Sequence, residues 1–161
     1  MHDNFIGQFK NVKIKKAYEV NKLNIWIILL VEEEIMKEKF YHCPICGNKF
    51  AVIVDSGITP ICCGQEMELI HPNSVDASNE KHVPEVIVKD DVCHVEVGAV
   101  PHPMLKEHHI EWILVVTNKG RHRILLDETV PAVVDIPLAK GEKVLRVYEY
   151  CNLHGLWVKE L

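Results

Sequence analysis

A cysteine and a histidine stand three residues apart in the segment Tyr150-Cys151-Asn152-Leu153-His154-Gly155, near the end of the printed chain. A thiolate and an imidazole both bind transition metals, and the glycine that follows can take turn geometry that other residues resist. One cysteine and one histidine cannot complete a tetrahedral site. The pair therefore either recruits distant ligands or packs in the core, and taken alone it favours packing, because free cysteine is among the most buried residue types.

Three further histidines lie in polar, turn-rich segments, where a core would not use them. His82 is in Glu80-Lys81-His82-Val83-Pro84, His102 stands between two prolines, and His108 precedes a strand-like run that begins at Ile110. We predict that all three lie on loops or strand ends, where a rigid scaffold presents functional groups. Four imidazoles and one thiolate are too many ligands for a structural zinc. Such a set suits iron, with the imidazoles in a square, the cysteine axial and the opposite face open.

A second cluster of metal-binding residues lies earlier in the chain. Cys43-Pro44-Ile45-Cys46 has the spacing of a metal knuckle, and the adjacent Cys62-Cys63 supplies two more thiolates. Four thiolates suit tetrahedral zinc or iron, and so short a segment needs the metal for folding energy. Neighbouring side chains on an extended strand point to opposite faces, so Cys62 and Cys63 can reach one metal only if the backbone bends. A structural zinc ribbon remains the alternative.

The composition limits the possible functions. The chain has 161 residues, six cysteines and a formal net charge of −5, which argues against nucleic-acid binding because that needs clustered lysine and arginine. Tight cysteine pairs in a chain without a convincing export signal predict metal ligands in a reducing, cytoplasmic setting. The most apolar run, Leu23 to Val31, is too short to span a bilayer, and we expect no membrane segment.

The start of the chain has a separate interpretation. Glu32, Glu33 and Glu34 are encoded by purines alone, just upstream of the codon for Met36, as in a bacterial ribosome-binding site. We therefore interpret residues 1–35 as an extension and hypothesise that the natural protein starts at Met36. The four-cysteine domain would then occupy residues 36–74, and a second domain residues 75–161.

The second domain reads as a series of short strands. Runs at 85–89, 92–97, 110–117, 121–126, 132–136, 143–150 and 156–159 are separated by turn residues, and no stretch keeps a helical period for long. Asn118-Lys119-Gly120 looks like a hairpin turn with glycine where a positive φ is wanted. Strands at this spacing predict an antiparallel β-sandwich, which makes the whole chain all-β.

These residues resemble a known family. The segments around His82, His102, His108 and Cys151–His154, with Cys-Pro-Ile-Cys-Gly-Asn and Cys-Cys-Gly-Gln ahead of them, look like superoxide reductase in its two-iron form, desulfoferrodoxin. The match runs from about Lys37 to Trp157. It implies a small desulforedoxin-like domain followed by an immunoglobulin-like sandwich. It departs from the family at His109, where an aromatic residue is common, and in residues 1–35, which have no counterpart.

The resemblance also implies an activity. Two iron ions would be held, one by Cys43, Cys46, Cys62 and Cys63 and one by His82, His102, His108, His154 and Cys151, and the second would reduce superoxide to hydrogen peroxide. Lys81 would attract the anion, and Glu80 would occupy the vacant position in the oxidised enzyme. A rubredoxin-like electron donor and a homodimer are also implied. The alternatives are an iron electron-transfer protein without substrate turnover and a zinc-binding structural module.

Overall fold

The computed structural model describes residues 37–74 and 79–161, with the side chains of Asn79 and Glu80 excepted. The chain separates into two units, a larger one of Phe40–Phe50 with Ser56–Leu161 and a smaller one of Met1–Lys39 with Ala51–Asp55. In the smaller unit the Val52 N–H donates to the Lys39 carbonyl at 2.9 Å. The hypotheses about residues 1–35 and about a domain boundary at 74–75 concern residues at or beyond the limits of the described ranges, so both stay predictions.

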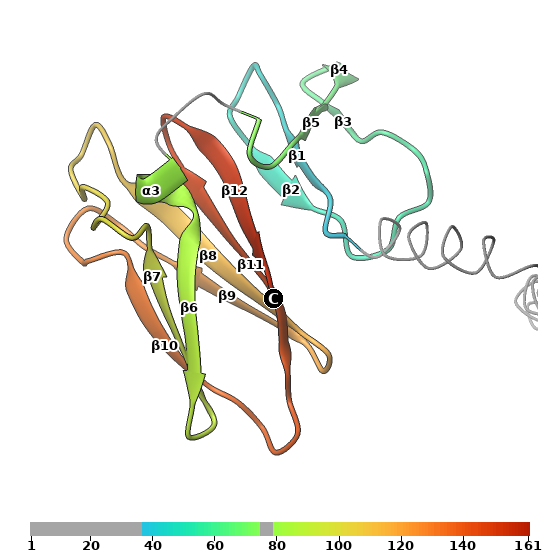
Figure 1. Ribbon diagram of the computed structural model, residues 1–161. Coiled ribbons are helices and arrows are strands. Elements are labelled where there is room, and N and C mark those ends of the chain that lie inside the picture. Colours follow the sequence, from blue (N-terminus) through green and yellow to red (C-terminus); the bar gives the residue numbers. More distant parts are fainter. Residues whose placement is uncertain (1–36, 75–78) are drawn as a thin grey trace, which may run out of the picture. The chain divides into compact units, whose positions relative to one another are not determined.

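Two antiparallel sheets form a β-sandwich in the larger unit (Figure 1). The first sheet has the order β10-β7-β6, and the second the order β12-β11-β8-β9. The first is built from β6 (Pro84–Lys89), β7 (Val92–Val97) and β10 (Val133–Pro137). The second is built from β8 (Ile110–Thr117), β9 (Arg121–Leu125), β11 (Val144–Cys151) and β12 (Gly155–Glu160). The predicted all-β, immunoglobulin-like class is confirmed, and the seven strands lie close to their expected ranges.

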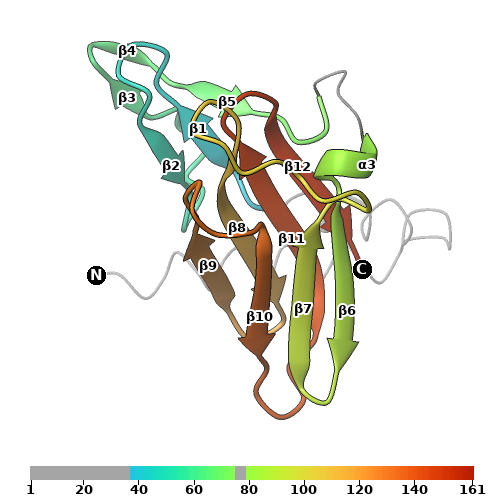
Figure 2. The ribbon, with the colours of Figure 1, turned by 90° about the vertical axis from the view of Figure 1, so that its left-hand side faces the viewer.

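The core between the sheets comes from alternate residues of facing strands. On β7, Cys93, Val95 and Val97 are fully buried and alternate with partly exposed neighbours, as expected for one apolar face. These side chains pack against residues of β8, β10 and β11 in one cluster. Figure 2 shows the first sheet in front of the second. Strand β7 is therefore held in the sandwich by its buried face, and the loop that follows it carries metal-binding residues.

Strand β8 is buried on both faces, which explains its almost unbroken apolar sequence. Ile113 and Val115 face the inner core, whereas Trp112 and Leu114 belong to a second cluster that includes Phe40. The rings of Phe40 and Trp112 are 5.3 Å apart. The second cluster thus joins the four-cysteine segment to the outer face of the four-stranded sheet.

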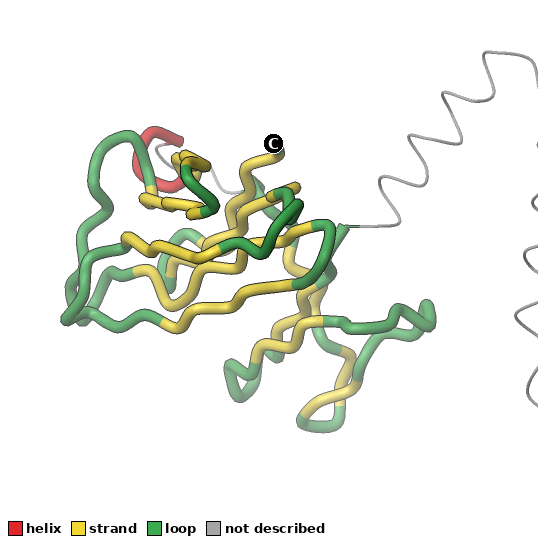
Figure 3. The backbone as a smooth tube through the Cα atoms, turned by 90° about the horizontal axis from the view of Figure 1, so that it is seen from below, coloured by secondary structure: helices red, strands yellow, loops and turns green. Residues whose placement is uncertain are grey.

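The four-cysteine segment contains only short strands among the described residues (Figure 3). One sheet has the order β2-β1-β5, and a separate hairpin pairs β3 with β4. The strands are β1 (Phe40–His42), β2 (Lys49–Ala51), β3 (Ile61–Cys62), β4 (Gln65–Glu66) and β5 (Glu68–Ile70). The buried Met67 separates β4 from β5 and donates its N–H to the Pro60 carbonyl at 2.9 Å.

Two local expectations were wrong. Gly120 does not have the positive φ expected in its turn; instead the Thr117 hydroxyl oxygen accepts N–H bonds from Lys119 and Gly120 at 3.1 and 2.9 Å. His82 lies not on a loop but at the end of a short helix, α3 (Asn79–His82). Pro84 begins β6 two residues later, so the proline ends the helix and starts the strand.

Candidate metal centres

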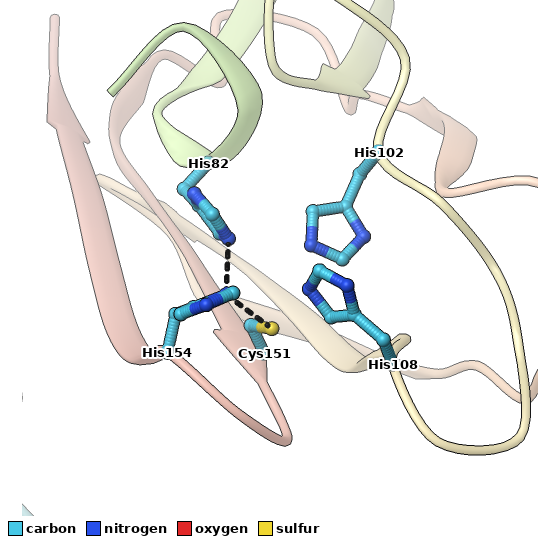
Figure 4. Close-up of side chains that lie close together, drawn as sticks. All are labelled: His82, His102, His108, Cys151 and His154. Carbon is cyan, nitrogen blue, oxygen red and sulfur yellow. Dashed lines mark hydrogen bonds between the residues drawn. The ribbon is translucent and has the colours of Figure 1, made fainter. Parts of the chain in front are cut away.

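Five metal-binding side chains come together at one end of the sandwich (Figure 4). One nitrogen from each of His82, His102, His108 and His154 and the sulfur of Cys151 all lie within 4.8 Å of one another. His82 comes from α3, and His102 and His108 from the loop before β8. Cys151 is the last residue of β11, and His154 lies in the turn between β11 and β12. Residues up to 72 positions apart in the sequence therefore form one cluster, as the sequence predicts.

The turn that carries Cys151 and His154 is a tight hairpin loop. Cys151 pairs with Gly155 across β11 and β12, which leaves three residues to make the turn. Gly155 has a φ of 74°, a left-handed conformation that costs glycine little. This geometry brings the Cys151 Sγ to 3.5 Å from the His154 Nδ1. The two residues, three apart in the sequence, therefore present adjacent metal-binding atoms.

His82 is fixed by close packing on both sides. The residue is 2% exposed, and its ring stacks on Trp157 with centroids 5.0 Å apart and planes 19° apart. Its Nε2 lies 2.9 Å from the His154 Nδ1. Behind α3, Gly98 approaches so closely that a Cβ added to it would lie 2.7 Å from the backbone of Lys81. Only glycine lets the residue after β7 come so close to the helix.

The ring nitrogens of His102 and His108 are placed as those of metal ligands would be. The Nε2 atoms of His102 and His108 are buried and have no hydrogen-bond partner among the residues that the structure describes, which is costly unless something else binds them. The His102 Nδ1 donates to the Pro103 carbonyl at 2.7 Å, so its Nε2 is the atom left to accept. Such an outer hydrogen bond is the usual means of fixing the tautomer and orientation of a metal-ligating histidine.

The ionisation states are also those of a ligand set. Burial lowers the pKa of His102 to about 4 and also lowers the pKa of His108, so both rings are neutral near pH 7. Burial raises the pKa of the Cys151 thiol, against the backbone N–H groups of Leu153 and His154, which lower it. A metal ion at this cluster would therefore displace a proton from the sulfur and none from these two rings.

A buried carboxyl group that the sequence reading missed lies two residues before Cys151. Glu149 is 0% exposed, and neither of its carboxyl oxygens has a partner within the described part of the chain. Burial raises its pKa well above the ordinary value, and its negative charge would raise the pKa of Cys151 in turn. Period-two alternation from Val147 to Cys151 places Glu149 on the inner face, which is the signal that could have revealed it.

The second cluster is formed by the four cysteines, whose sulfurs also lie within 4.8 Å of one another. Cys63 has a φ of 50° and Gly64 a φ of 82°, and these two residues form the turn between β3 and β4. The expected bend between Cys62 and Cys63 is therefore present, and it brings both sulfurs to the same side. The backbone N–H groups of Cys46 and Ile45 offset burial and lower the pKa of Cys43 to about 7, which favours a thiolate there.

The two residues predicted to act on the substrate lie on α3. Lys81 is exposed, and its charge reaches the cluster, because it adds to the lowering of the pKa of His108, of which burial is the main cause. The side chain of Glu80 lies outside the described residues, so its role stays a prediction. No helix among the residues the structure describes is long and apolar enough to cross a membrane.

Comparison with known proteins agrees with this pair of sites. A family model described as desulfoferrodoxin matches residues 74–160, and one described as desulfoferrodoxin, N-terminal domain, matches residues 36–70. The chain belongs to the desulfoferrodoxin family. The desulfoferrodoxin of Syntrophotalea carbinolica is 41% identical over 124 residues, which cover 77% of this chain and 97% of that protein. The desulfoferrodoxin of Desulfarculus baarsii is 41% identical over 122 residues, covering 74% and 94% respectively.

A solved structure extends the likeness to the fold. The crystal structure of the superoxide reductase from Treponema pallidum matches with a TM-score of 0.66 and 31% identity, over 77% of this chain and 99% of that one. The two clusters described above fit the two iron centres of a desulfoferrodoxin, four thiolates in one and four histidines with one cysteine in the other. The resemblance inferred from the sequence is thereby confirmed.

Proposed function

We propose that this desulfoferrodoxin is a superoxide reductase, which adds one electron and two protons to superoxide and releases hydrogen peroxide. The observation that carries the proposal is the convergence of four imidazole nitrogens and one sulfur within 4.8 Å. The T. pallidum protein, which shares this fold, is itself a superoxide reductase. Iron bound by the five residues would supply the electron.

The protein's own groups would prepare the site for a small anion. The neutral rings of His102 and His108 leave their Nε2 atoms free to bind, and the Trp157 N–H donates to the His154 carbonyl at 3.2 Å, which holds that ligand's backbone in place. We propose that the exposed Lys81 ammonium attracts superoxide to the cluster against the net charge of −5. Glu80, one residue earlier, is proposed to occupy the vacant position in the oxidised form.

The first test concerns the metal and the reaction together. Protein loaded with iron should contain two irons per chain, and superoxide generated by pulse radiolysis should oxidise the reduced protein with release of one hydrogen peroxide per superoxide. Two irons without superoxide-dependent oxidation would favour an electron-transfer protein. Zinc in both sites of protein from native cells would favour a structural module, and either result refutes the enzyme.

The role of Lys81 has a matched control. Lys81→Ala should slow the reaction with superoxide roughly fivefold at low salt, since about 1 kcal/mol is the attraction of two unit charges in contact in water. Lys89→Ala makes the same change in net charge at the exposed end of β6, at the β6–β7 turn, and should leave the rate unchanged. Equal rates for the two variants across ionic strengths would show that Lys81 does not steer the anion.

We also propose a homodimer, a rubredoxin-like electron donor and a cytoplasmic location. Apolar side chains are unusually exposed near the four-cysteine cluster: Ile45 is 61%, Ile58 77% and Ile61 73% exposed. A second copy of the chain would cover such a surface. Sedimentation equilibrium should give a dimer for the native protein and a monomer for Ile58→Lys.

The proposed cytoplasmic location is supported by the cysteines. All six are free thiols, which suits a reducing compartment.

A further inference from the structure

Asn152 connects two loops that each carry metal-binding residues. It lies in the turn between Cys151 and His154, and its side chain reaches across to the loop that carries His108. Its Oδ1 accepts a hydrogen bond from the backbone N–H of His109 at 2.9 Å, and its Nδ2 donates to the carbonyl of Glu107 at 3.0 Å. Its own backbone N–H donates to the His109 carbonyl at 3.1 Å. The amide thus holds the residue before His108 and the residue after it.

The loop that Asn152 holds is already closed on itself. Leu105 and His108 exchange two backbone hydrogen bonds, of 2.9 and 3.0 Å, and the His109 Nδ1 donates to the Leu105 carbonyl at 3.0 Å. Residues 105–108 therefore form a compact turn. The three bonds of Asn152 tie that turn to the residue after Cys151, next to the strand pairing of Cys151 with Ile110.

We propose that Asn152 is a positioning residue, which sets the His108 ring at the correct distance from Cys151 and His154 before any metal binds. The inference rests on the proposed metal site but not on the superoxide reaction. Both partners of the side chain are backbone groups, so they fix the main chain on each side of His108 and not merely one rotamer. Loss of an outer hydrogen-bond partner of a metal ligand typically costs 10–100-fold in metal affinity.

An amide is the one group that suits both partners. Aspartate would still accept from the His109 N–H, but it would present an oxygen to the Glu107 carbonyl and lose that bond. It would also place a negative charge beside the Cys151 sulfur, which lies 3.9 Å from the Oδ1. Alanine would lose both side-chain bonds. Asn152→Ala should therefore disturb the position of the loop more than Asn152→Asp does. Only Asn152→Asp changes the charge next to the thiolate.

The chain offers a matched control in Asn118. Its Oδ1 accepts from the backbone N–H of Lys143 at 2.9 Å, and its Nδ2 lies 3.4 Å from the Gly141 carbonyl. Its amide therefore makes the same type of two-point contact, here between the turn after β8 and the loop before β11. Both lie at the ends of these strands that are farther from the five-residue cluster. Asn118→Ala should weaken the fold without affecting metal affinity.

The test uses the full chain and Co²⁺ as a probe. Competition with a chelator, followed through the thiolate-to-metal absorption, should show a 10–100-fold weaker five-residue site in Asn152→Ala, with the four-cysteine site unchanged. Wild-type affinity at the five-residue site in that variant overturns the proposal. Co²⁺ binding does not depend on superoxide turnover, so failure of the proposed activity would leave this result readable.

Hydrogen exchange gives a second readout that needs no metal. In the metal-free chain, the His109 N–H, which donates to the Asn152 Oδ1, should exchange faster in Asn152→Ala than in the native protein, and should be unaffected by Asn118→Ala. If Asn152→Ala does not fold, Asn152→Asp, which keeps the bond from the His109 N–H and loses the bond to the Glu107 carbonyl, should still weaken Co²⁺ binding at the five-residue site. Equal protection of this loop in all variants would refute the positioning role.

Discussion

The close approach of Gly98 to the helix that carries His82 gives the sharpest prediction. A Cβ at position 98 would lie 2.7 Å from the Cα, carbonyl carbon and carbonyl oxygen of Lys81. Carbon atoms in contact normally stand at about 3.5–4.0 Å, so the backbone of α3 would have to move by about 1 Å. The obstructing atoms belong to the main chain next to His82, so no side-chain rotation can relieve the contact.

The expected cost of Gly98→Ala has two parts. The φ of 81° is a left-handed conformation, and a side chain there costs roughly 1–2 kcal/mol of folding free energy. A displacement of about 1 Å at a site that depends on its geometry can lower a catalytic rate by about 10²-fold. We therefore expect a modest loss of stability and a large loss in the rate of superoxide reduction.

Comparison with Gly141→Ala separates the loss of stability from the loss of rate. Gly141 has a φ of 73°, and a Cβ added there would meet nothing within 4 Å. In urea, Gly141→Ala should lose only the cost of a side chain at positive φ, whereas Gly98→Ala should lose this and the cost of moving the α3 backbone. Only Gly98→Ala should lose iron from the five-residue site or react slowly in pulse radiolysis. Native rates and iron content in Gly98→Ala would refute the argument that this approach positions His82.

Two further predictions concern parts of the sandwich away from the metal. The turn between β6 and β7 consists of Asp90 and Asp91, with φ values of 51° and 59°, so replacing them with Asn-Gly should raise the free energy of unfolding by about 1 kcal/mol in urea titrations; no gain would contradict it. The Thr117 hydroxyl, with His122, lowers the pKa of Glu142 from 4.5 to about 2. The stability that this carboxylate contributes should therefore be lost as pH falls from 4.5 toward 2, and Glu142→Gln should lack this part of the pH dependence of the melting temperature; the same slope in both proteins would contradict it.

Most of the sandwich could be predicted because each strand carries its own signal. The alternation of Cys93, Val95 and Val97 with polar neighbours needs no knowledge of the rest of the fold, and the strand over Val92–Val97 is found as predicted. Gly120 was misjudged because a threonine hydroxyl satisfies its turn, and the N–H groups it binds depend on how the turn closes. Local patterns predict strands better than they predict which of several turns connects them.

The ligands of the site could be predicted from residue type, but the groups that position them could not. Histidines and cysteines are recognisable wherever they occur. Asn152, by contrast, becomes important only because its amide faces the backbone of Glu107 and His109, and that pairing depends on the alignment of two strands distant in sequence. Gly98 is similar, because the sequence does not reveal which backbone comes close to it.

A bulge in β8 is the feature that sets this alignment. Tyr150 pairs with Trp112 and Cys151 with Ile110, so one step along β11 spans two residues of β8, and Glu111 is the extra one. Strict alternation would put Ile110 and Ile113 on opposite faces, yet both lie in the inner core. Because the bulge comes immediately before Cys151 in the pairing, it also fixes where His108 emerges from the strand. If the side chains alternated strictly along the whole of β8, the chain leading back to His108 would lie on the opposite face of the sheet. The sequence alone does not show the bulge, so it does not show on which face His108 lies.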